Sequence, residues 1–137
     1  MNLEKLDLSN IKSFGYVEEY RSGEVIFNEG DTCDKLGLVL EGEAKIFTYT
    51  YQDKEEIINN VRTGDLFGQF MLFSKHNNYV GTCVALRKTS VLFLSKSNFI
   101  KLTKIDESFL LQYLEEISEI SFNLKQQVKL YAHKNIR

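Results

Sequence analysis

Two glycine-containing segments carry the residues of this sequence that are best suited to hold a small ligand. Residues 64–69 read Gly-Asp-Leu-Phe-Gly-Gln, and residues 79–81 read Tyr-Val-Gly. A turn after Gly68 would offer backbone N–H groups, which bind anions, and the Gln69 amide can bond a hydroxyl group. Neither segment contains an arginine or a lysine, so the cation that usually pairs with a buried phosphate is missing from both.

Metal chemistry and nucleophilic catalysis find little support in the sequence. The metal-ligating residues beyond the carboxylates are two histidines, His76 and His133, and two cysteines, Cys33 and Cys83. A catalytic metal site needs several converging ligands, and an iron–sulfur cluster usually needs four thiolates. The sequence therefore predicts no catalytic residues and no metal site. We interpret Cys33 and Cys83 as small buried apolar residues, with a redox switch between them as the alternative.

Length and composition describe one ordinary domain. The chain has 137 residues, of which 43% are hydrophobic and 26% charged, and its net charge is -2. This balance disfavours a freestanding nucleic-acid binder, which needs a basic surface. The first residues do not form a signal peptide, and no apolar run is long enough to cross a bilayer. We therefore expect a cytoplasmic protein that makes no membrane contact.

Short β-branched and aromatic runs dominate residues 16–95. Glycines and polar clusters separate these runs, and no helical period intervenes. Many short strands at such spacing indicate an antiparallel sandwich or barrel. Leu3, Leu6 and Ile11 predict a short amphipathic helix ahead of the strands. The expected strands span residues 16–20, 25–28, 35–40, 44–51, 55–61, 79–85 and 91–94.

The periodicity becomes helical after Ser95. Ser95 can cap a short helix that ends near Thr103, and Asp106 can cap a second helix with no breaker after it. The second helix would be about 45 Å long at 1.5 Å per residue. Its apolar positions recur at alternating intervals of four and three, the pattern of a coiled-coil seam. The seam residues are Leu110, Leu114, Ile117, Ser121, Leu124, Val128 and Tyr131.

We expect this seam to form the interface of a homodimer. A separate line of apolar residues, Phe109, Tyr113 and Ile120, is available to pack on the strands. Because that line can serve the chain's own core, the seam is left for a second neighbour. The alternative is that the seam itself packs on the β domain of the same chain.

The glycines between positions 23 and 68 follow a recognisable pattern. A Gly-x-x-Ile is followed by a Gly-Asp turn, by a glycine between two strands and by Gly-Asp-x-Phe-Gly. In this combination the sequence resembles the cyclic-nucleotide-binding domain of the Crp/Fnr transcription regulators, the family of the catabolite activator protein. The matching residues are Gly23, Ile26, Gly30, Asp31, Gly42, Gly64, Asp65, Phe67 and Gly68.

The resemblance implies a mainly β fold with flanking helices. Residues 1–105 would form a sensor domain, a cupin-type double-stranded jelly-roll β-barrel with a short N-terminal helix. Residues 106–137 would form a long dimerisation helix, which in the family leads to a helix-turn-helix DNA-binding domain that this sequence does not include.

The function implied is that of the effector-sensing and dimerisation domain of a transcription regulator. The homodimer would contact DNA only through the helix-turn-helix domain that lies outside the sequence. The alternative is a stand-alone cyclic-nucleotide-binding module that regulates a partner protein. A helix-turn-helix encoded after Arg137 would distinguish the two.

The resemblance also implies an effector pocket, formed by Phe67, Gly68, Gln69, Phe70, Tyr79, Val80 and Gly81. In the family a Glu binds the ribose, and an Arg followed by Ser or Thr and then Ala binds the phosphate. Here Gln69 stands in place of the Glu, and Tyr79 stands in place of the Arg. Losing a charge-assisted bond to a buried phosphate costs about 1.5–3 kcal/mol. We therefore expect that the chain does not respond to cyclic AMP.

Two interpretations of the pocket stay open. Tyr79 and Val80 make it less cationic and more apolar, which suits a neutral or aromatic effector. Equally, Tyr79 can fill the cavity as an internal ligand, so that no effector binds. Lys75 and His76 could supply positive charge from the intervening loop, and His76 could ligate a haem as in some relatives of the family, but an exposed polar loop is the favoured interpretation.

Overall fold

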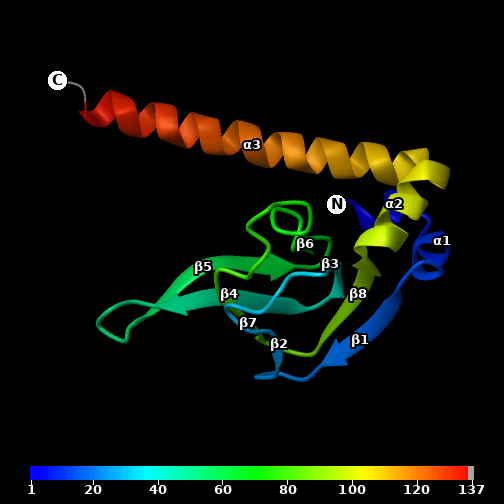
Figure 1. The fold of residues 1–137 in the computed structure, drawn as a ribbon, viewed down its shortest axis with the longest axis horizontal. Coiled ribbons are helices and arrows are strands. Elements are labelled where there is room, and N and C mark those ends of the chain that lie inside the picture. The colour runs from blue at the N-terminus through cyan, green and yellow to red at the C-terminus, as the bar shows by residue number, and fades with distance from the viewer. Residues whose placement is uncertain (136–137) are drawn as a thin grey trace.

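The computed structural model describes residues 1–135 (Figure 1). It contains two four-stranded antiparallel sheets, with strand orders β1-β8-β3-β6 and β2-β7-β4-β5. The chain changes sheet at every connection except the β4–β5 hairpin, which is the topology of a jelly roll. The strands are β1 (Tyr16–Tyr20), β2 (Val25–Phe27), β3 (Lys35–Glu41), β4 (Glu43–Tyr49), β5 (Glu55–Arg62), β6 (Leu66–Phe67), β7 (Thr82–Ala85) and β8 (Thr89–Ser95).

The predicted jelly roll is confirmed, but its sheets do not close into a barrel. Among residues 1–135, no hydrogen-bonded ladder joins one sheet to the other. Side chains close the fold instead. Four consecutive residues of β3, Leu36 to Val39, are buried, so both faces of this strand are covered. One apolar cluster joins β3 and β8 to Ile11, Phe99 and Leu102 of the flanking helices.

The N-terminal segment forms two short pieces instead of the single helix expected. A 3-10 turn, η1 (Leu3–Lys5), precedes the helix α1 (Leu8–Lys12). Asp7 separates them because its carboxylate accepts the backbone N–H of Asn10 at 3.1 Å and so starts a new helix.

The two C-terminal helices begin at the caps that the sequence predicts. The Ser95 hydroxyl accepts a backbone N–H at 3.1 Å and starts α2 (Lys96–Ile105). The Asp106 carboxylate accepts another at 3.0 Å and starts α3 (Glu107–Asn135). At 1.5 Å per residue, the 29 residues of α3 extend about 43 Å.

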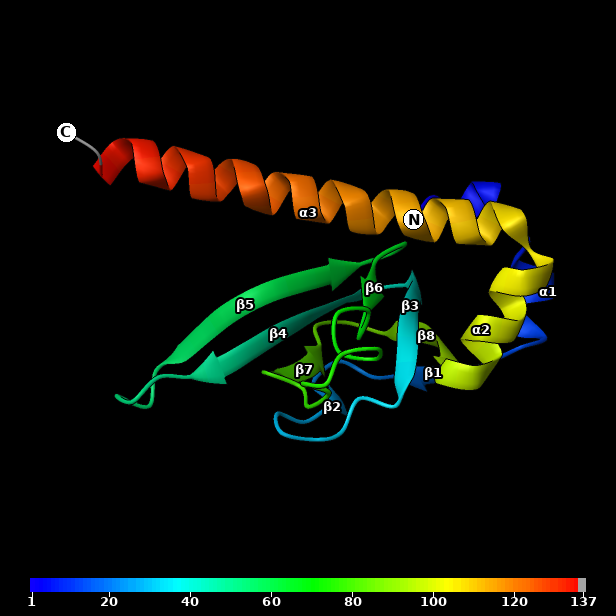
Figure 2. The same cartoon turned by 45° about the horizontal axis from the view of Figure 1, so that its top comes forward.

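The long helix runs along one side of the β domain, on the side of β5 and β6 (Figures 1 and 2). Figures 1 and 2 show α3 running from the α2 end of the molecule toward the side to which the β4–β5 hairpin points. Its first turns are anchored, since Phe109 is buried and Tyr113 packs on the core cluster. The Met1 ammonium pairs with the Glu116 carboxylate at 2.8 Å and adds a polar contact to this half.

Two segments near the predicted pocket differ from the expected strands. The strand expected from Tyr79 begins only at Thr82. Tyr79 instead pairs with the β2–β3 loop, where its N–H donates to the Asp31 carbonyl at 2.9 Å and its own carbonyl accepts from Gly30 at 2.8 Å. β6 was not predicted, because two residues are too few to show an alternating pattern.

Gly68 is a position where the backbone requires glycine. It follows β6 with a φ of +85°, and a Cβ there would lie 2.9 Å from the Lys35 carbonyl oxygen and 3.1 Å from Cys33 Sγ. Gly23 has a similar φ of +88°, but a Cβ there would meet nothing within 4 Å. Substitutions at Gly23 and Gly68 therefore distinguish the free-energy cost of a positive φ from the added cost of a close contact with neighbouring atoms.

We predict that Gly23→Ala lowers the free energy of unfolding by about 1–2 kcal/mol, the cost of a left-handed non-glycine residue. Gly68→Ala should lose about 1–3 kcal/mol more, because neighbouring backbone must also move. Urea unfolding of both variants measures the difference. Equal decreases in the free energy of unfolding would show that the close contacts at Gly68 add nothing to the cost of the substitution.

Candidate functional site

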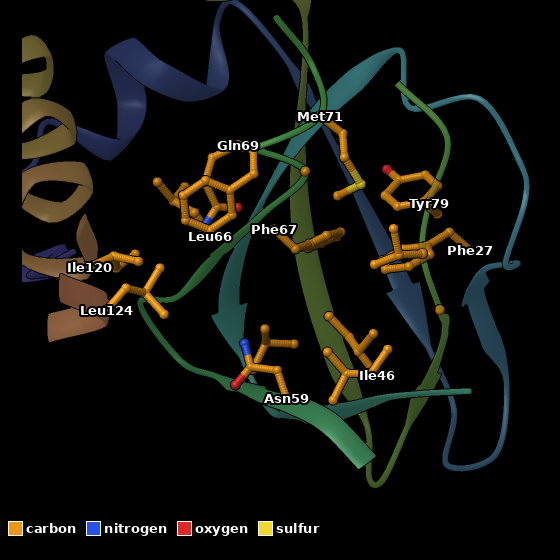
Figure 3. A pocket seen from close by; sticks show the side chains of 16 residues that line it. Phe27, Ile46, Asn59, Leu66, Phe67, Gln69, Met71, Tyr79, Ile120 and Leu124 are labelled. Carbon is orange, nitrogen blue, oxygen red and sulfur yellow. The ribbon is translucent and has the colours of Figure 1, made fainter. Parts of the chain in front are cut away.

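A cavity of about 350 Å³ lies between the β2-β7-β4-β5 sheet, the β6–β7 connection and α3 (Figure 3). Such a volume falls within the range of small-molecule sites. The residues that line it are Phe27, Ile46, Ile58, Asn59, Val61, Leu66, Phe67, Gly68, Gln69, Phe70, Met71, Tyr79, Val80, Gly81, Ile120 and Leu124.

The structure brings all seven residues of the predicted pocket into this lining. Phe67 to Phe70 come from β6 and the turn after it, and Tyr79 to Gly81 come from the segment before β7. The remaining lining residues were not assigned to the pocket from the sequence, because strands distant in the chain supply most of them. Ile120 and Leu124 were noted only for their place on the C-terminal helix.

The segment after Gly68 forms one helical turn. The N–H groups of Met71 and Leu72 donate to the Gly68 carbonyl at 3.2 and 2.9 Å. This turn directs Gln69, Phe70 and Met71 toward the cavity. The Cys33 thiol donates to the same carbonyl at 3.7 Å and fixes the turn against the β2–β3 loop.

Tyr79 fills one end of the site with its ring. The side chain is 6% exposed, and the ring stacks on Phe27 with 3.8 Å between centroids and 13° between planes. Phe67 continues the stack at 5.5 Å from Phe27 (Figure 3). Burial raises the pKa of the Tyr79 phenol, and its hydrogen bond with Cys33 adds to the rise. Tyr79 is therefore uncharged at neutral pH.

No Lys, Arg, His, Asp or Glu is present among the residues that line this cavity in the described part of the chain. Hydrogen bonds can come from the side-chain amides of Asn59 and Gln69 and from the Tyr79 hydroxyl. Lys75 and His76 are exposed and do not reach the lining. The site is consequently an apolar space with a few neutral polar groups.

A smaller and more polar cavity of about 180 Å³ adjoins this site beneath α3. The two cavities share five lining residues: Asn59, Val61, Leu66, Gln69 and Ile120. Asn60, Asp65 and Glu116 complete the smaller one. Both Asn60 Oδ1 and Glu116 Oε2 are buried atoms that accept no hydrogen bond from the described residues.

α3 supplies one wall of the site. Ile120 and Leu124 lie on the side of the cavity opposite Phe27 and Tyr79 (Figure 3). Ile120 belongs to the line expected to pack on the strands, and Leu124 belongs to the seam expected to face a partner. Leu124 is 54% exposed and thus touches the cavity with only part of its surface.

The other predicted seam residues differ in their exposure. Leu110 and Ile117 are half-buried, whereas Leu114, Ser121 and Val128 are exposed. The Tyr131 side chain lies outside the described residues.

The remaining reactive side chains do not form a site. Cys33 and Cys83 are buried free thiols, and burial raises the pKa of the Cys83 thiol to about 12. The described residues contain no cluster of three or more His, Cys, Asp or Glu placed to hold a metal ion. His76 is exposed, and the side chain of His133 lies outside the described residues. None of the described helices combines the length and hydropathy that a bilayer crossing requires.

Known structures with the same architecture are numerous. A transcriptional regulator from Thermotoga maritima superposes with a TM-score of 0.83 at 22% identity, over 92% of this chain and 98% of that one. The catabolite activator protein of Thermus thermophilus gives 0.76 at 22% identity, over 94% of this chain and 59% of that one. Oxidised CprK in complex with o-chlorophenolacetic acid gives 0.73 at 16% identity, over 91% of this chain and 52% of that one.

At these identities the likeness shows the fold. The chain spans only about 59% of the length of the catabolite activator protein. A comparison with curated protein sequences gives no match. The sequence model of the cyclic nucleotide-binding domain matches residues 17–106, which is more than half of the chain. The chain therefore belongs to the cyclic nucleotide-binding domain family, and its fold is that of the sensor domains of Crp/Fnr-type transcription regulators.

Proposed function

We propose that this chain is the effector-sensing and dimerisation module of a cytoplasmic Crp/Fnr-type regulator that does not respond to cyclic AMP. The observation that carries the proposal is the double role of α3. Ile120 and Leu124 form a wall of the cavity, while other residues of the same helix stay uncovered. A ligand in the cavity would thus act directly on the helix that meets the partner.

The dimer half of the proposal rests on the exposed part of the seam. Leu114 is 49% and Val128 68% exposed in the single chain. A seam of this heptad spacing is stabilised by pairing with a second helix. Two sensor domains joined along α3 would report the state of their cavities by the packing of the two helices. DNA binding would belong to a domain outside this sequence.

The effector half rests on the chemistry of the cavity. A cyclic nucleotide carries a phosphate anion, and burying an anion without a paired charge is costly. The resemblance to the family implies that Tyr79 stands where the phosphate-binding arginine would be, and its ring, stacked on Phe27, adds bulk without charge. Among the described residues, the lining holds no Lys, Arg or His. Cyclic AMP and cyclic GMP are therefore poor ligands for this site.

Sedimentation tests the seam directly. We predict a dimer for the wild-type chain and mainly monomer for Val128→Glu, because like charges would face each other in the seam. Phe122→Glu is the matched control. Phe122 is also an exposed apolar residue of α3, at 57%, but it lies about 120° around the helix from Val128. A monomeric wild type, or equal dissociation by both variants, would contradict the proposed interface.

Calorimetry tests the replacement of the arginine. We predict that wild-type protein binds cyclic AMP no more tightly than millimolar. The double variant Tyr79→Arg/Val80→Ser should bind it about ten- to hundredfold more tightly than wild type, since a charge-assisted bond is restored.

The control for that gain is Tyr79→Leu, which removes the ring but adds no charge. It should leave cyclic AMP binding weak. Micromolar affinity of the wild-type chain, or an equal gain in Tyr79→Leu, would show that the missing charge is not what excludes the nucleotide. Thermal unfolding of each variant verifies that it is folded.

A further inference from the structure

The two adjoining cavities are lined by chemically different residues. Their combined lining indicates which class of ligand would fit. The larger one is bounded mainly by hydrocarbon from Phe27, Ile46, Val61, Leu66 and Phe67, and none of residues 1–135 that line it has an ionised side chain. A charged ligand would lose its hydration there without gaining a partner charge. An uncharged apolar body loses nothing comparable and gains the burial of its surface.

The size of the larger cavity limits that body. An apolar cavity of about 150 Å³ holds one benzene molecule. The volume of about 350 Å³ thus accommodates about two fused rings or an aliphatic molecule of similar bulk. The aromatic rings of Phe27 and Phe67 in the lining favour a planar ring system, which can pack offset or edge-on against them.

The polar end lies beneath α3. Asn60 Oδ1 and Glu116 Oε2 are buried acceptors without a donor among the described residues. The other Glu116 oxygen already accepts the Met1 ammonium at 2.8 Å. A hydroxyl or N–H group arriving between the cavities would satisfy one of these acceptors, whereas a carboxylate or phosphate there would be repelled by Glu116.

We propose that the joined cavities bind an uncharged, two-ring-sized apolar molecule that carries one hydrogen-bond donor, with its body against Phe27 and Phe67 and its donor toward Asn60 and Glu116. This inference rests on the proposed sensor function and names the class of its effector. The ligand contacts Ile120 and so meets α3 at the point where the two cavities join.

A matched set of naphthalenes tests the class. 2-Naphthol has the neutral body and one donor, 2-methoxynaphthalene lacks the donor, and 2-naphthoate carries a negative charge. Calorimetry on the whole chain should give 2-naphthol the highest affinity. The methyl ether should bind about three- to tenfold more weakly, and the carboxylate at least about tenfold more weakly.

Two variants locate the binding. Asn60→Leu keeps roughly the volume of the side chain and removes one of the two acceptors, so it should reduce the preference for 2-naphthol over its methyl ether. Ile120→Glu places a charge in the wall and should lower 2-naphthol affinity at least about tenfold. The matched control is Leu111→Glu on the same helix, where the side chain is 52% exposed and does not line the cavities.

The outcomes separate this inference from the proposed function. Tighter binding of 2-naphthoate, or no binding of any naphthalene while cyclic AMP also fails to bind, would overturn the neutral-ligand class and leave the sensor proposal standing. Micromolar binding of cyclic AMP would overturn both. Equal effects of Ile120→Glu and Leu111→Glu would place the ligand elsewhere. A thermal-unfolding midpoint close to wild type shows that each variant is folded.

Discussion

The stack of Tyr79 on Phe27 is the contact on which the site depends. Backbone hydrogen bonds to Gly30 and Asp31 hold Tyr79 in place, and its ring closes one end of the cavity in an aromatic row that Phe67 extends. Because a phenol of raised pKa stays neutral, this end provides bulk and a hydroxyl but no charge. A jelly roll of the family's type thus encloses a pocket whose aromatic end carries no charge.

The wall of the cavity opposite Tyr79 belongs to α3, the helix through which a bound ligand would be sensed. Phe109 and Tyr113 anchor the start of α3, Ile120 faces both cavities, and Leu124 is shared between the cavity and the exposed seam. No intervening layer is needed to connect the pocket with the helix. A ligand shifts an equilibrium only by binding its states differently, and a contact with α3 would supply such a difference where the two states place this helix differently.

The sequence was informative where local chemistry decides the structure. Ser95 and Asp106 act as caps because capping involves only the next turn. The seven residues that the family resemblance assigned to a pocket line one cavity. The sequence was uninformative where distant segments meet. Asn60 and Glu116 come together only through the packing of α3 over β5, and Tyr79 leaves the expected strand to pair with a loop fifty residues earlier. The open sheets, too, reflect side-chain packing that a strand pattern does not encode.

The most direct measurement is a methyl NMR titration that follows Ile120 and Leu124, the two residues of α3 that line the cavity. We predict that 2-naphthol shifts both resonances in a saturable manner and that cyclic AMP at millimolar concentration leaves them in place. Saturable shifts with cyclic AMP at micromolar concentration, or no shift with 2-naphthol, would contradict a neutral cavity that acts on α3.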